Sequence, residues 1–167
     1  MTLVPASFRH WRAALRFDEI SLGFGGVRLA TLVELEAFQI GYSMSLDGTN
    51  LCSDAPGYWR STWLAIGEET SGGDPLILDT SSKALAVLTA RHGLGQWDPY
   101  PVATSLAALD AALNVLAQTS RGRENPVALE RNPMTEEERE LALSVIGAAN
   151  PGIDLQYWDL LLTRDDA

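Results

Sequence analysis

The sequence has 167 residues, of which 46% are hydrophobic and 20% are charged, a composition typical of one globular domain with a sizeable core. No apolar run approaches the roughly 18 residues needed to cross a bilayer, and a net charge of −10 opposes binding to a nucleic-acid backbone. The lone cysteine, Cys52, precludes an intramolecular disulfide, and no secretory signal is recognisable, so we expect a cytoplasmic protein without membrane contact.

The N-terminal part of the chain predicts two helices and a short strand. Pro5 is suited to open the first helix, because a missing N–H costs nothing at that position. Apolar residues then recur at helical spacing, which places three arginines mostly off the apolar face: Arg9, Arg12 and Arg16. Thr31 and Glu34 have the capping-box spacing of a second helix, which Gly41 ends. Alternation of residue types then predicts a strand from Ile40 to Leu46.

The stretch from Trp63 to Asp79 predicts a β-hairpin. Two short apolar runs flank a turn that contains Gly72, Gly73 and Asp74. Glycine adopts positive φ without steric cost and aspartate hydrogen-bonds its own backbone, so this cluster favours a tight turn. A third strand is expected within Leu85 to Ala90, and it would extend the hairpin into a meander at the centre of a sheet.

The clearest helical pattern follows this meander. Thr104 or Ser105 is expected to cap the helix, and Gly122 and Pro126 are expected to stop it. Its inner stripe consists of leucines at spacings of three, four and three: Leu106, Leu109, Leu113 and Leu116. This stripe predicts a helix that faces the sheet.

Two further helices are predicted near the C-terminus. Thr135 and Glu138 form a capping box, and the helix that follows is expected to have three apolar residues on its inner face: Leu141, Val145 and Ile146. Asp154 is expected to cap a last short helix. The order of helices, then strands, then helices indicates an α+β fold, in which helices cover a central, mostly antiparallel sheet.

The sequence contains few candidates for catalysis. It has neither a nucleophile elbow nor a phosphate-binding glycine loop. His10 and His92 lie far apart without a further ligand at metal-binding spacing, so no metal or cofactor is expected. Glu68, Glu69 and Asp74 offer paired carboxylates for a hydrolase, and His92, in a turn beside Trp97 and Asp98, offers a general base. A solvated turn makes a raised pKa difficult to achieve, and turn formation is therefore their expected role.

Aromatic and acidic residues are the candidates for partner binding. Trp59 follows a Pro-Gly turn beside Tyr58, and it is expected to be an exposed anchor of the kind found at interface centres. The candidate partner-binding set adds the acids of the turns: Tyr58, Trp59, Glu68, Glu69, Asp74 and Asp98. Acidic residues favour a basic partner, because opposite charge accelerates encounter. An alternative is small-molecule or peptide sensing in a cleft near the central turn, lined by Trp59, Trp63 or Trp97.

Several short motifs follow one another in a recognisable order. They are Leu3-Val4-Pro5 with Phe8 and Trp11, Gly25-Gly26 with Leu29 and Leu32 to Leu35, Trp63, Ile66, Gly67, Gly73-Asp74 and Leu76 to Asp79, then Val87 to Gly93, Trp97 and Leu106 to Leu116. In order and spacing, these motifs resemble the SUKH superfamily, which includes fungal regulators of cell-wall assembly and bacterial immunity proteins that neutralise toxins. The chain departs from the family at Phe17-Asp18-Glu19, where an Asn-Gly dipeptide is expected.

The resemblance implies a fold, a class of function and a domain division. Residues 1–124 would form a SUKH-like α+β domain, and residues 125–167 a C-terminal helical extension packed on the same domain. The implied protein has no enzymatic activity and binds a protein partner, as an immunity protein or related regulator that neutralises a basic toxin. An uncharacterised hydrolase and a sensing domain stay open as alternatives, and so does the oligomeric state.

Overall fold

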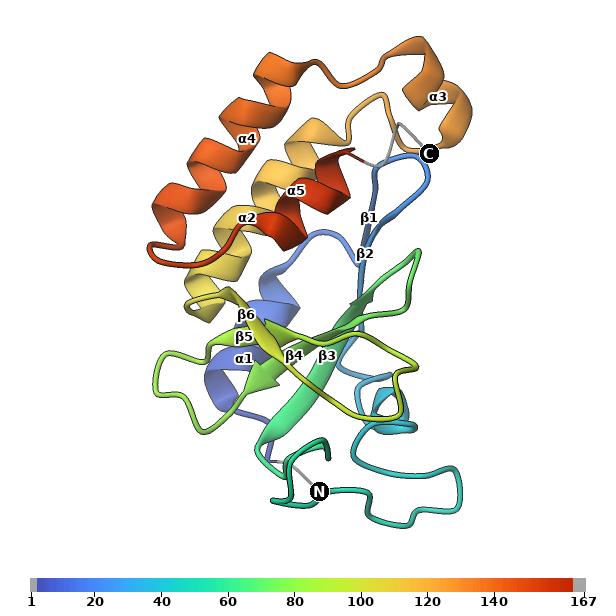
Figure 1. Ribbon diagram of the computed structural model, residues 1–167, viewed down its shortest axis with the longest axis vertical. Helices are drawn as coiled ribbons and strands as arrows, with labels where there is room; N and C mark the ends of the chain where they lie inside the picture. The colour runs from blue at the N-terminus through green and yellow to red at the C-terminus, as the bar shows by residue number, and fades with distance from the viewer. Residues whose placement is uncertain (1–2, 164–167) are drawn as a thin grey trace.

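A six-stranded sheet forms the centre of the computed structural model, which describes residues 3–163 (Figure 1). Its strands lie side by side in sequence order, and each neighbouring pair is antiparallel. The strands are β1 Glu19–Ser21, β2 Gly26–Leu29, β3 Trp63–Glu69, β4 Pro75–Asp79, β5 Val87–Thr89 and β6 Tyr100–Ala103. The helices are α1 Ala6–Ala14, the 3₁₀ helix η1 Ala37–Gln39, α2 Leu106–Thr119, α3 Pro126–Arg131, α4 Glu136–Ala149 and α5 Gln156–Thr163. The predicted α+β class is confirmed.

The predicted hairpin is formed by β3 and β4. Glu69 closes its turn through backbone hydrogen bonds: its N–H donates to the carbonyl of Asp74 at 2.8 Å, and its carbonyl accepts from Gly73 at 2.9 Å. Gly73 has a φ of +73°, which side-chain-bearing residues rarely adopt. Earlier in β3 a bulge shifts the register at Gly67. A Cβ atom at Gly67 would lie 2.4 Å from the carbonyl oxygen of Arg28, so only glycine allows β2 to approach β3 there.

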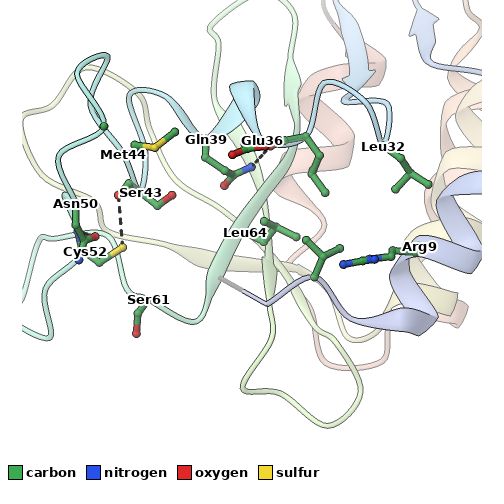
Figure 2. A pocket seen from close by; sticks show the side chains of 13 residues that line it. Arg9, Leu32, Glu36, Gln39, Ser43, Met44, Asn50, Cys52, Ser61 and Leu64 are labelled. Carbon is green, nitrogen blue, oxygen red and sulfur yellow. Dashed lines mark hydrogen bonds between the residues drawn. The ribbon is translucent and has the colours of Figure 1, made fainter. Parts of the chain in front are cut away.

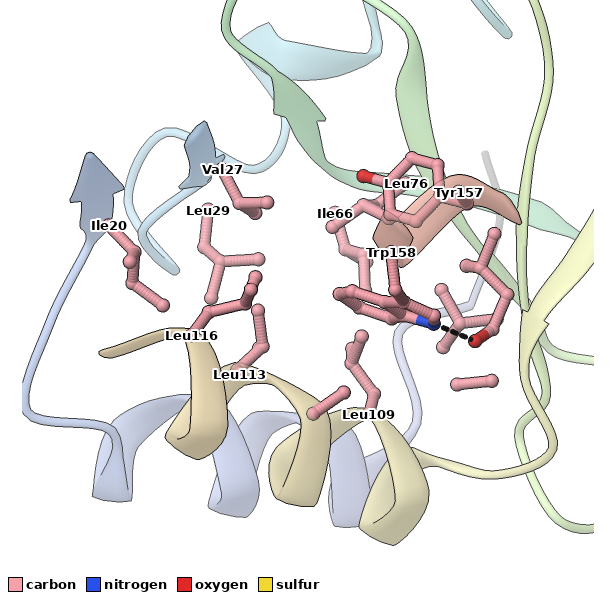
Figure 3. Packing of buried hydrophobic residues seen from close by; sticks show 14 of the residues in the cluster. Ile20, Val27, Leu29, Ile66, Leu76, Leu109, Leu113, Leu116, Tyr157 and Trp158 are labelled. Carbon is pink, nitrogen blue, oxygen red and sulfur yellow. Dashed lines mark hydrogen bonds between the residues drawn. The ribbon is translucent and has the colours of Figure 1, made fainter. Parts of the chain in front are cut away.

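The main core lies between the sheet and the helices α1, α2, α4 and α5. The predicted leucine stripe of α2 points at β2 and β3, and its members Leu109, Leu113 and Leu116 are fully buried (Figure 3). Ser105 caps α2, as predicted. Trp158 of α5 is also fully buried, and its indole Nε1 donates to the carbonyl of Val102 in β6 at 2.9 Å. The C-terminal helices therefore complete the same core as the sheet.

The C-terminal helices differ in two respects from the prediction. Thr135 and Glu138 form the predicted capping box of α4, but Leu141 and Val145 are 67% and 46% exposed. The buried stripe of α4 contains Ala142 and Ile146 instead. The small side chain of Ala142 allows α4 to lie close to α2, and Leu141 and Val145 then face outward. Residues 126–131, where Pro126 was expected to act only as a stop, form α3, because Pro126 occupies the first helical turn behind an Asn cap.

The predicted second helix and the strand after it are wrong. Thr31 and Glu34 make the hydrogen bonds of a capping box, with the N–H of Thr31 donating to Glu34 Oε2 at 3.0 Å. The chain nevertheless continues only as turns and the 3₁₀ helix η1. Within 40–46, only isolated bridges occur at Ile40 and Met44. The cause is tertiary: the Gln39 side chain bonds to β3, and the backbone must turn there instead of continuing as a helix.

Arg12 is a further correction. It was expected off the apolar face of α1 but is only 5% exposed. Its guanidinium Nε donates to the carbonyl of Ala30 at 2.7 Å, its Nη2 donates to that of Leu29 at 3.3 Å, and it forms an ion pair with Asp18. Arg12 thus satisfies backbone carbonyls at the end of β2, where the sheet offers no further partner. The strands β1, β2 and β6 were not predicted; β6 contains Pro101, which an edge strand tolerates.

Candidate functional site

The three acids of the central hairpin hold the turn and its surroundings together. Glu69 is only 4% exposed, and its carboxylate accepts from the backbone N–H groups of Ser71 at 2.7 Å and of Gly72 at 2.6 Å. Glu68 pairs with Arg28 across the sheet at 3.3 Å. Asp74 accepts the N–H of His92 at 2.7 Å. These contacts favour the turn-forming role of the acids over an acid–base role.

Trp59 is buried, and the expectation of an exposed anchor is wrong at this position. It is 1% exposed, and its ring centroid lies 5.0 Å from that of Tyr42, 5.2 Å from Trp97 and 5.7 Å from Trp63. Its indole N–H donates to the carbonyl of Trp63 at 3.0 Å. Trp59 therefore fixes the loops to the sheet on the side opposite α2. Tyr58 points the other way and is 57% exposed.

The aromatic cluster brings some of the predicted site residues together. Burial, followed by the negative charges of Glu68 and Asp74, raises the pKa of Tyr42 to about 12, so its hydroxyl stays protonated at neutral pH. Trp97 pairs with Gly57 through a backbone hydrogen bond of 2.8 Å. This bridge places the segments of Tyr58 and Asp98, both exposed, next to each other.

Residues 31–58 form the acidic loop surface, drawn in blue to teal in the lower part of Figure 1. Residues 29–59 contain four acids and no lysine, arginine or histidine. The exposed acids of this surface are Glu34, Glu36, Asp47 and Asp54. The same surface carries exposed large apolar side chains, which lie before, between and after these acids in the sequence: Leu32, Val33, Ile40, Leu46, Leu51 and Tyr58.

Hydrogen bonds keep part of this negative charge in place. The Ser45 hydroxyl, and then the N–H of Thr49, donate to Asp47 and lower the pKa of its carboxyl to about 2. The N–H and hydroxyl of Thr31 lower the pKa of Glu34 in the same way. These hydrogen bonds therefore favour the ionised form of both carboxylates.

A pocket of about 600 Å³ opens between the acidic loop surface, the N-terminal segment and β3 (Figure 2). Its apolar wall contains Leu32, Leu35 and Leu64, and Ser43, Asn50 and Cys52 gather at one end. Two charged side chains, Arg9 and Glu36, also line it. Trp59, Trp63 and Trp97, which were expected to line a sensing cleft, are not among the lining residues that the structure describes. The pocket thus lies elsewhere than the cleft expected near the central turn.

One polar side chain fixes the wall of the pocket. The amide of Gln39, which is 7% exposed, donates to the carbonyls of Leu35 at 2.9 Å and Ala65 at 2.8 Å. Its oxygen accepts the N–H of Ala65 at 3.0 Å. Because β2 ends at Leu29, Gln39 takes the place of a strand beside Ala65. Nearby, burial raises the pKa of the Cys52 thiol.

The residues of the pocket come from segments that are distant in sequence, and the predicted site contained none of them. One signal was present in the sequence, namely the run of 29–59 without a basic residue. Within residues 3–163, no group of three or more His, Cys, Asp and Glu side chains is arranged to hold a metal ion. Across those same residues, no helix has the length and apolar character that would let it span a bilayer.

Comparisons with known proteins do not identify a relative of this chain. The resemblance to the SUKH superfamily, and the division at residue 124, therefore stay predictions from the sequence. No protein-family model matches the chain, and neither curated proteins nor solved structures show a significant similarity to it.

Proposed function

We propose that the chain is a non-enzymatic binding protein that neutralises a basic protein toxin in the cytoplasm, as an immunity protein does. The observation that carries the proposal is the acidic loop surface, where exposed apolar side chains alternate with acids over a stretch without a basic residue. Protein interfaces combine apolar contact with complementary charge in this way. Tyr58, more than half exposed, is suited to be one of its aromatic anchors.

The basic residues that border this stretch support the same reading. Arg28 is engaged by Glu68 at 3.3 Å and by Glu34 at 3.7 Å, and its guanidinium lies 5.5 Å from the ring centroid of Phe38. Arg60 lies over the ring of Trp63 at 5.4 Å. Both cations are therefore held by neighbours of this chain, and the stretch between them contributes four acids and no basic residue.

The proposal is tested with the toxin encoded by a neighbouring gene. The full chain is expected to co-purify with that toxin, and the association rate is expected to fall as salt increases, because screening weakens electrostatic steering. Asp54→Lys should lower the association rate by about tenfold. Glu137→Lys, on the outer face of α4, is the matched control, since it makes the same change of charge at an exposed residue outside the loop surface.

Two results would count against this function. One is a failure of the chain to co-purify with the neighbouring toxin. The other is an equal loss of association rate in Asp54→Lys and Glu137→Lys, because only total charge would then matter. Thermal unfolding of both variants is measured alongside, and we expect it to match that of the parent chain because both side chains are exposed.

A further inference from the structure

The pocket beside η1 has two charged side chains that no other side chain engages in the described part of the chain. Within residues 3–163, neither the guanidinium of Arg9 nor the carboxylate of Glu36 takes part in a side-chain hydrogen bond or an ion pair. Arg9 extends from α1 at one end of the pocket, and Glu36 stands in the wall formed by the loop (Figure 2). A cation and an anion that both lack partners are suited to a ligand that carries both charges.

Apolar side chains form part of the pocket lining beside these charges. Leu35 and Leu64 are 5% and 2% exposed, and both line the pocket together with Leu32 and Met44. The volume of about 600 Å³ falls within the roughly 300–1,000 Å³ of small-ligand sites. A ligand that is complementary to this pocket therefore carries apolar side chains in addition to its two charged ends.

The pocket is formed before any ligand arrives. Gln39 fixes the wall through its three hydrogen bonds to Leu35 and Ala65. Leu64 belongs to β3, a central strand. A preformed wall lowers the ordering cost that a ligand must overcome.

We propose that this pocket binds a short apolar peptide with free termini, of the size of dileucine. Its carboxylate pairs with Arg9, its ammonium group pairs with Glu36, and its side chains pack on Leu35 and Leu64. The inference does not depend on the toxin proposed above, because it concerns a ligand in the pocket and not a partner on the surrounding surface. Its test uses the protein alone.

The experiment titrates Leu-Leu into the full chain by calorimetry, in parallel with N-acetyl-Leu-Leu and Leu-Leu-amide. Saturable binding of Leu-Leu is expected, and each blocked end should weaken it about tenfold by removing one charged contact. Arg9→Gln should weaken Leu-Leu similarly but leave the amide unaffected, since that peptide has no carboxylate to lose. Glu36→Gln should behave in the same way toward the acetylated peptide. Arg16→Gln, an exposed arginine outside the pocket, is the matched control.

Cys52 provides a second readout at the same site. It is the only cysteine of the chain and lines the pocket. Bound Leu-Leu should therefore slow the alkylation of Cys52 by iodoacetamide. In the Arg9→Gln variant, the same concentration of Leu-Leu should not slow this alkylation. The proposal is overturned if Leu-Leu shows no saturable binding up to millimolar concentration. It is also overturned if blocked and free peptides bind equally well, or if the two charge variants affect all three peptides alike.

Discussion

The two faces of the sheet are covered by different kinds of structure. On the helical face, aliphatic side chains of α2, α4 and α5 pack in a continuous core on the strands. On the loop face, a smaller cluster is centred on Tyr42, Trp59 and Trp63 and covered by irregular chain. The first face is stabilised by many similar contacts, whereas the second depends on a few rings and on Gln39. The contacts that stabilise the two faces therefore differ in kind.

The largest expected effect is a loss of packing on the helical face. Leu113→Ala should lower the free energy of unfolding by about 3 kcal/mol, because Leu113 is fully buried and its truncation leaves a cavity in the α2 stripe. Denaturation by urea, monitored by circular dichroism, measures this change. A loss below about 1 kcal/mol would mean that the helices can collapse into the space, and the contrast between the two faces would weaken.

Gln39→Ala is expected to have the next largest effect and to act on the loop face. It removes three hydrogen bonds and leaves the backbone groups of Ala65 without a partner, at a cost of about 2 kcal/mol. Amide hydrogen exchange should accelerate at Ala65 more than in α2. Gln118→Ala, at an exposed position of α2, is the control and should change stability by less than about 0.5 kcal/mol. Equal acceleration in both regions would contradict a local role for Gln39.

The smallest effect concerns the ionisation of Tyr42. Its pKa of about 12 in the folded chain exceeds the ordinary value of 10.0. The stability that depends on the neutral hydroxyl is therefore fully present below pH 10 and is lost as the pH rises through 12. Absorbance of the phenolate, compared between the parent chain and Tyr42→Phe, isolates this titration. A midpoint near 10 in the difference curve would show that the loop face admits water freely.

Sequence reasoning succeeded where local chemistry determines local structure. The hairpin at Gly73, the cap at Ser105 and the capping box at Thr135 each depend on residues within a few positions of one another. It failed where distant segments decide the outcome. Thr31 makes its capping bonds, yet no α-helix follows, because Gln39 is held by β3. The exposure of a residue beside a turn, such as that of Trp59, likewise depends on rings that are remote in sequence.

The candidate site was less predictable than the fold. The turn acids Glu68, Glu69 and Asp74 were located correctly in the hairpin region, but their partners could not be read from spacing. The pocket combines Arg9 of α1, Glu36 of the loop and Leu64 of β3. No periodicity links three such segments, so their meeting becomes visible only when the chain is folded.

The side-chain amide of Gln39 makes the hydrogen bonds to Ala65 that a neighbouring strand would otherwise make. This arrangement affects which part of the chain can vary in sequence. The chain between Gln39 and Trp59 is tied to the sheet mainly near its two ends, by that amide and by the Trp59 indole. Substitutions or length changes at the exposed positions between these anchors leave strand pairing untouched, whereas Tyr42 packs on Trp59 and Trp97 and is part of the buried cluster. The exposed part of the intervening loop can thus vary in sequence and length while the sheet stays the same.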